Sequence, residues 1–195
     1  MAAMKMIFRT ISAGAFLIPS WAALGDTPVM KTNSFADVFN QTARNNNVDK
    51  TATLEKCRSG LFPGCLYKIS ERTKVLVAGK PEDTPKSLTV ITVRKGEQIS
   101  GLFSAEDETV WPLIVQILNP EQPPEQRKVP ADKFEAMMQA AQSSFTTKIG
   151  ANRYSVAAAP DMGIWMIANI KASTSTSDTT WIIKWRRRIE GWIKK

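Results

Sequence analysis

The sequence predicts an α+β fold: a small, mostly antiparallel sheet with two or three helices, followed by a C-terminal amphipathic helix. Segments rich in β-branched residues come in pairs with turn residues between them, and other segments carry apolar residues at helical spacing. An apolar content of 43% is enough for a packed core. A length of 195 residues suits one domain with terminal extensions, and we place that domain at residues 26–172.

Residues 1–25 are typical of a secretory signal peptide. Lys5 and Arg9 make the start positive, Ile11–Leu24 carries no charge, and small residues near Gly25 fit a cleavage site. The apolar run is shorter than the roughly 20 residues of a membrane-spanning helix. We expect cleavage after Gly25 and a periplasmic or secreted protein that can lie against a membrane. An uncleaved anchor and an intracellular helix are the alternatives.

The first half of the domain contains one predicted helix and one predicted strand pair. Ser34–Asp37 matches a capping box and predicts a short helix that ends at the polar run Arg44–Asn47. Leu66–Ala78 and Leu88–Val93 are rich in β-branched residues. They predict an antiparallel pair joined by the loop Gly79–Lys86.

Cys57 and Cys65 predict a structural disulfide. A single pair behind an export signal suits an oxidising compartment, and the segment between them is turn-prone. The spacing is not C-x-x-C, and two thiols alone do not form a zinc site. Free thiols are the alternative.

The second half of the domain predicts further helices and a closing strand pair. Val110–Leu118 is apolar almost throughout, and we place its helix start near Glu108, because an earlier start at the possible capping box Ser104–Asp107 puts Pro112 beyond the first turn. Four prolines predict a loop over Asn119–Pro130. A core-facing helix then follows at helical spacing, with Phe134, Met137, Met138, Ala141 and Phe145 on its apolar side.

The chain then returns to strands before it becomes polar. Arg153–Ala159 and Ile164–Ile170 predict a strand pair around the turn Pro160–Gly163. Residues 173–180 are almost wholly serine and threonine, which predicts a flexible linker.

No catalytic motif is evident. Histidine is absent, which removes the commonest residue of Ser-His-Asp and Cys-His catalysis and of zinc sites. Glu106, Asp107 and Glu108 form the densest carboxylate cluster, and acids at this place are expected to complement the positive end of a helix. We therefore expect no enzyme, cofactor or metal. A histidine-free hydrolase that uses these carboxylates is a remote alternative.

The net charge of +8 is concentrated in the tail, which we define as residues 181–195. Asp26–Thr179 holds 18 basic and 17 acidic residues, whereas Thr180–Lys195 contributes +5. On a helix, Trp181, Trp185 and Trp192 fall within an arc of about 40°. The isoleucines at 182, 189 and 193 lie beside them, and the opposite side carries a cluster of cations: Lys184, Arg187, Arg188, Lys194 and Lys195.

This pattern predicts a helix that lies on an anionic membrane or envelope polymer, with the tryptophans as interfacial anchors and the five cations as phosphate contacts. The tail can instead pack on the domain, dock on a partner protein, or bind nucleic acid; export makes nucleic acid unlikely, and the linker argues against packing. We expect an exported, non-enzymatic binding protein. The alternative is a periplasmic inhibitor or immunity-type protein that binds a toxin or envelope enzyme through its α+β body.

Overall fold

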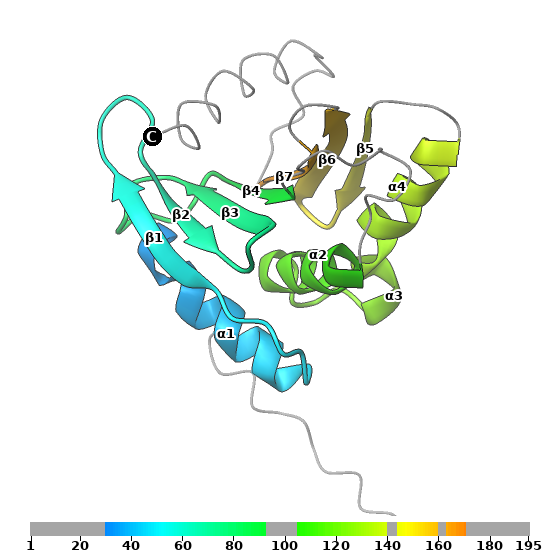
Figure 1. Cartoon of the computed structure of the whole chain (residues 1–195), viewed down its shortest axis with the longest axis horizontal. Coiled ribbons are helices and arrows are strands. Elements are labelled where there is room, and N and C mark those ends of the chain that lie inside the picture. The colour runs from blue at the N-terminus through cyan, green and yellow to red at the C-terminus, as the bar shows by residue number, and fades with distance from the viewer. Residues whose placement is uncertain (1–29, 93–104, 140–143, 160–162, 171–195) are drawn as a thin grey trace, which may run out of the picture.

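The computed structural model describes residues 30–92, 105–139, 144–159 and 163–170. Its fold is α+β, as the sequence predicts, but its sheet is larger than expected (Figure 1). Seven strands are present: β1 (Thr53–Arg58), β2 (Gly64–Lys68), β3 (Thr73–Ala78), β4 (Ser87–Thr92), β5 (Ser144–Ile149), β6 (Asn152–Ala159) and β7 (Gly163–Asn169). The helices are α1 (Phe35–Asn45), α2 (Ala105–Leu118), α3 (Pro124–Arg127) and α4 (Val129–Gln139), with a 3₁₀ turn at Thr32–Ser34.

The strands lie in the order β1-β2-β3-β4-β7-β6-β5, and every neighbouring pair is antiparallel. Strands β1 to β4 form one meander and β5 to β7 form another. The two meanders meet where β4 pairs with β7, from Ser87 opposite Asn169 to Thr92 opposite Ile164. This pairing places the last of the described strands in the interior of the sheet.

The described α-helices pack against one face of the sheet, which we call the inner face (Figure 1). Phe35 and Phe39 of α1 are fully buried, and the ring of Phe35 lies 5.0 Å from that of Tyr67 on β2. Trp111 of α2 meets Phe134 of α4 edge to face, with ring centroids 5.8 Å apart. Each large side chain buried in this way stabilises the fold by roughly 1.5–3 kcal/mol.

The other face of the sheet, which we call the outer face, carries the alternate strand residues. Leu66, Leu76, Thr89 and Ile167 stand directly opposite one another in a row across β2, β3, β4 and β7. Ile91 and Trp165 form a neighbouring pair on β4 and β7. All six side chains are almost fully buried.

Two strands were not expected, and one expected strand is a hairpin. Leu66–Ala78 divides into β2 and β3 because the hydroxyl of Ser70 accepts hydrogen bonds from the backbone N–H groups of Arg72 and Thr73, which forms a turn without glycine or proline. Strand β1 is an edge strand with mostly exposed side chains. Strand β5 contains Phe145, which was wrongly assigned to a helix that in fact ends at Gln139.

The helix starts also differ from expectation. Helix α2 begins at Ala105 and therefore contains Pro112, so the later start near Glu108 was wrong. An interior proline costs about 3 kcal/mol, which burial of Val110, Trp111 and Ile114 on the same helix more than offsets. The short helix α3 lies within the segment that was expected to be a loop.

Ser34 occupies the predicted N-cap position of α1, but the expected cap is not formed. Its hydroxyl accepts a hydrogen bond from the backbone N–H of Lys31 at 3.0 Å instead of one from the helix. The Ser34 hydroxyl is thus used by the 3₁₀ turn before α1 and does not cap the helix.

Candidate functional site

The disulfide between Cys57 and Cys65 is present, as the sequence predicts. It joins two residues that stand directly opposite each other on β1 and β2. The loop that it closes presents two large apolar side chains to solvent: Leu61 is 93% exposed and Phe62 is 53% exposed. Exposed pairs of this kind are typical of contact sites when they gather on one small surface.

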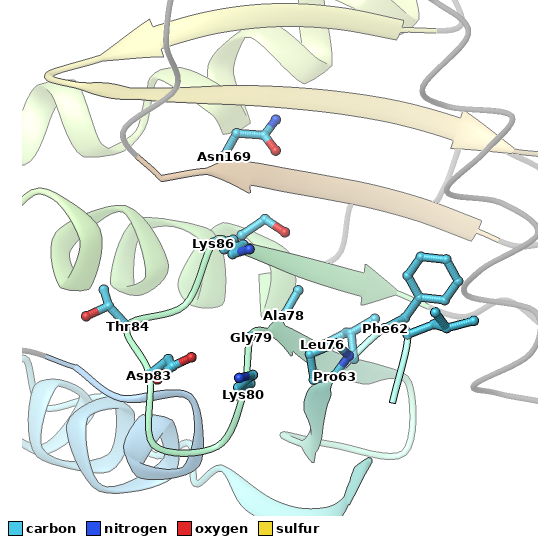
Figure 2. Close-up of a pocket in the computed structure, with 12 residues that line it drawn as sticks. Phe62, Pro63, Leu76, Ala78, Gly79, Lys80, Asp83, Thr84, Lys86 and Asn169 are labelled. Atoms are coloured by element: carbon cyan, nitrogen blue, oxygen red, sulfur yellow. The ribbon is translucent and has the colours of Figure 1, made fainter. Parts of the chain in front are cut away.

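A pocket of about 400 Å³ lies beside this loop, at one end of the outer face (Figure 2). Its walls come from the disulfide loop, β3, the β3–β4 loop and the first residue of β4, which lie close together in the sequence, and from the end of β7, which is far from them in the sequence. The apolar part of the wall includes Leu61, Phe62 and Leu76, and the polar part includes Lys80, Asp83, Thr84, Lys86 and Asn169.

Backbone hydrogen bonds fix the walls of this pocket. The N–H of Gly79 donates to the carbonyl of Pro63 at 3.0 Å, which ties the β3–β4 loop to the disulfide loop. The N–H of Ile170 donates to the carbonyl of Lys86 at 3.1 Å, which ties the end of β7 to the start of β4. The pocket is therefore largely pre-formed, as small ligand sites usually are.

The lining suits recognition of a ligand that is partly apolar and partly anionic. Lys80 and Lys86 supply two positive charges against the single carboxylate of Asp83. Thr84 and Asn169 supply neutral hydrogen-bonding groups, and Leu61 and Phe62 supply apolar surface. The arrangement of charged, hydrogen-bonding and apolar groups is suited to binding a small ligand.

The strongly shifted titratable groups lie elsewhere, in the helix-side core. Burial raises the pKa of Tyr67 to about 12. Its neutral hydroxyl donates to the carbonyl of Thr32 at 2.7 Å. Burial also raises the pKa of Tyr154 well above its usual value, against the opposing effect of its hydrogen bond with the Asn119 amide. Both tyrosines are core residues with a polar tip.

Tyr154 belongs to a buried polar network between the end of α2 and the start of β6. The amide Nδ2 of Asn152 donates to the carbonyl of Leu118 at 2.9 Å and to Oδ1 of Asn119 at 3.0 Å. Asn119 in turn donates to the hydroxyl of Tyr154 and to the carbonyl of Val115. Every polar atom named here has a partner, so the network is structural.

The predicted tail residues, from Trp181 to Lys195, lie outside the described residues, as do the predicted signal peptide and linker. Of the carboxylate cluster, Glu108 is exposed on α2, and the side chains of Glu106 and Asp107 are outside the description. Within the described ranges, no group of three or more acidic or cysteine side chains is placed to hold a metal ion. No described helix is long and apolar enough to span a membrane.

The pocket was not predicted from the sequence. One local signal pointed to it: Leu61 and Phe62 are large apolar residues inside a turn-prone loop between two cysteines, where a loop usually exposes its side chains. The remaining lining residues carry no such signal. Comparison of the chain with protein-family models, with curated proteins and with solved structures gave no significant match.

Proposed function

We propose that this chain is an exported, non-enzymatic binding protein that attaches to an anionic membrane or envelope polymer through its tail. The observation that carries the proposal is the separation of three indoles from five cations around residues 181–195. Indoles favour the headgroup boundary of a bilayer, and long basic side chains keep their charges in water beside anionic headgroups.

The expected strength of attachment follows from this composition. Each basic residue close to an anionic bilayer contributes roughly 1 kcal/mol before screening by salt. With the burial of three indoles added, the affinity of the tail for anionic lipid is on the order of micromolar. Attachment of this kind is reversible and weakens as salt rises.

The position of the pocket supports a role in binding near that surface. Asn169 lines the pocket, and the chain leaves the described domain one residue later, at Ile170. A ligand in the pocket is therefore bound next to the point where the segment that leads to the tail begins. This arrangement suits a protein that holds its ligand close to a membrane or an envelope polymer.

Co-sedimentation with vesicles tests the attachment, on the chain from Asp26 to Lys195. Phosphatidylglycerol vesicles should pellet the protein at low salt, and phosphatidylcholine vesicles should not. The variant Arg187→Ser/Arg188→Ser should bind about 30-fold more weakly, since two charges contribute roughly 2 kcal/mol. The charge-matched control Arg44→Ser/Lys128→Ser removes two exposed cations from the domain and should bind normally. Equal binding to both kinds of vesicle contradicts the proposal.

A second candidate function is that of an inhibitor or immunity-type protein, favoured by the exposed apolar pair Leu61 and Phe62 on a disulfide-closed loop. A photo-crosslinking amino acid at Leu61 should then give one discrete adduct with an envelope protein, and Phe62→Ser should abolish it. The same group at Leu54, which is 46% exposed on β1, is the control. Adducts at Leu54 alone, or none at Leu61, contradict this function.

A further inference from the structure

The outer face of the sheet is apolar and buried, although the described helices cover the opposite face (Figure 1). Its six central side chains are at most 2% exposed: Leu66, Leu76, Thr89, Ile91, Trp165 and Ile167. An antiparallel sheet covered on one side normally exposes its alternate residues to water on the other. Exposure this low therefore requires a further layer on the outer face.

We infer that this layer is the tail: residues 181–193 dock on the outer face with their indoles and isoleucines, and release them when the tail meets an anionic membrane. Docking is independent of the proposed function, whereas release rests on it.

The chain begins its last segment at this face. Asn169, the last residue of β7, shares a row with Ser87 and Ala78 at the pocket end of the outer face. Residues 171–180 can span roughly 33 Å when extended, which is ample to bring the tail back over the sheet. A serine- and threonine-rich linker thus permits packing on the domain, which the sequence alone argued against.

The dimensions of the tail match those of the face. A helix over residues 181–193 is about 20 Å long at 1.5 Å per residue. The strands from β2 to β6 are separated by four spacings of about 4.8 Å, or roughly 19 Å. One helix of this length can therefore cross the row from Leu66 to Ile167 and extend to its neighbour on β6.

The polar groups on the face explain why an apolar cover can leave it. The hydroxyl of Thr89 and the indole Nε1 of Trp165 are buried, and neither has a hydrogen-bond partner among the described residues. A layer of indole rings and isoleucines offers no acceptor, so it would leave both groups unpaired. Both groups regain water when the layer departs, which makes the docked state easier to leave.

Charge favours the membrane as a competitor. Lys56, Lys68 and Lys74 share the outer-face rows on β1 to β3, where Lys56 stands opposite Leu66. Glu55 pairs with Lys74 and Glu71 pairs with Lys68, so Lys68 and Lys74 repel the cationic tail only weakly and do not attract it. An anionic bilayer offers the tail an apolar phase and opposite charge together.

Trp165 is a built-in reporter of docking, because it belongs to the domain and lies under the proposed cover. The chain Asp26–Lys195 is labelled with 5-fluorotryptophan, and the Trp165 signal is assigned with Trp165→Phe. Its ¹⁹F shift should be almost the same in H₂O and D₂O. In the variant Trp181→Ala/Trp185→Ala/Trp192→Ala the signal should become solvent-sensitive, while the single control Ile183→Ala, on the opposite side of the tail, should leave it shielded.

A folded triple variant in which Trp165 stays shielded overturns the inference, because residues 93–104 or a second copy then cover the face. A second copy is recognised by sedimentation of the wild-type chain as a dimer. A wild-type Trp165 signal that already senses solvent also overturns it.

A vesicle experiment tests release separately. If nine-tenths of the tail is docked, undocking should raise its affinity for phosphatidylglycerol vesicles about tenfold. Leu76→Ser on the outer face should show this gain, and Leu54→Ser, exposed on β1, should not. If Leu76→Ser unfolds the domain, Ile91→Ala replaces it. Unchanged affinity in the folded variant contradicts release. Absence of vesicle binding by every variant contradicts the proposed function, but it does not affect the Trp165 test of docking.

Discussion

Replacement of Asn152 by alanine should be one of the most damaging polar substitutions in this fold. Its amide donates to the carbonyl of Leu118 at 2.9 Å and to Oδ1 of Asn119 at 3.0 Å, and Asn152 itself is only 4% exposed. A buried acceptor that loses its donor costs about 1–3 kcal/mol. With two acceptors affected, we expect the free energy of unfolding to fall by about 2–4 kcal/mol.

The matched control is Asn46→Ala. The side chain of Asn46 also donates to a backbone carbonyl, that of Thr42 at 2.8 Å, but it is exposed. Water replaces this donor, so the cost should stay within about 0.5 kcal/mol. Urea unfolding followed by tryptophan fluorescence measures both variants with the disulfide intact.

Asn152→Asp separates the hydrogen bonds from packing, because it keeps the size of the side chain and removes the donor. It should destabilise at least as much as the alanine variant. The reasoning is refuted if Asn152→Ala costs no more than Asn46→Ala, since burial would then not decide the value of these hydrogen bonds.

Three further predictions concern stability. Reduction of the Cys57–Cys65 disulfide should lower the free energy of unfolding by about 2–3 kcal/mol, because the bridge closes a short loop; an unchanged urea midpoint with thiol reductant contradicts this. Gly150→Ala should cost about 1–2 kcal/mol in thermal unfolding, since φ is +57° and the new Cβ would lie 2.8 Å from Oδ1 of Asn119; a gain in stability would show that the turn relaxes. Burial raises the pKa of Tyr67 from 10.0 to about 12. Between these two pH values the unfolded chain loses the proton of this tyrosine and the folded chain keeps it. The contribution of Tyr67 to the free energy of unfolding is therefore constant below about pH 10 and falls by about 1.4 kcal/mol per pH unit from pH 10 to 12. Tyr67→Phe should lose that part of the slope, and equal slopes for both proteins would disprove the assignment.

The parts of the fold that the sequence predicts are those with a strong local pattern. Helix α1 carries Phe35 and Phe39 at helical spacing, and β6 and β7 are apolar segments on either side of turn residues in the sequence. Strand β1 escaped prediction because an edge strand buries little and therefore shows no alternation. Phe145 was misassigned because it fits helical spacing after Phe134 as well as it fits a strand.

Of the two candidate sites, the tail can be recognised from the sequence and the pocket cannot. The tail is a continuous segment, so its amphipathic pattern can be seen in the sequence and remains a prediction. The pocket combines the loop at Leu61 and Phe62 with Lys86 and Asn169, which meet only because β4 pairs with β7. No local pattern encodes a meeting of residues so far apart in the chain, and this is why the pocket needed the structure.

The interior position of β7 has a consequence for biosynthesis. Synthesis completes β7 after all the other described strands, yet its two neighbours, β4 and β6, are interior strands of the sheet. A nascent chain that stops before Gly163 therefore presents two unpaired edges instead of one smaller sheet. Such edges pair readily with other chains. Truncations in this region should aggregate rather than yield a shortened stable domain, whereas loss of the peripheral strand β1 should be better tolerated.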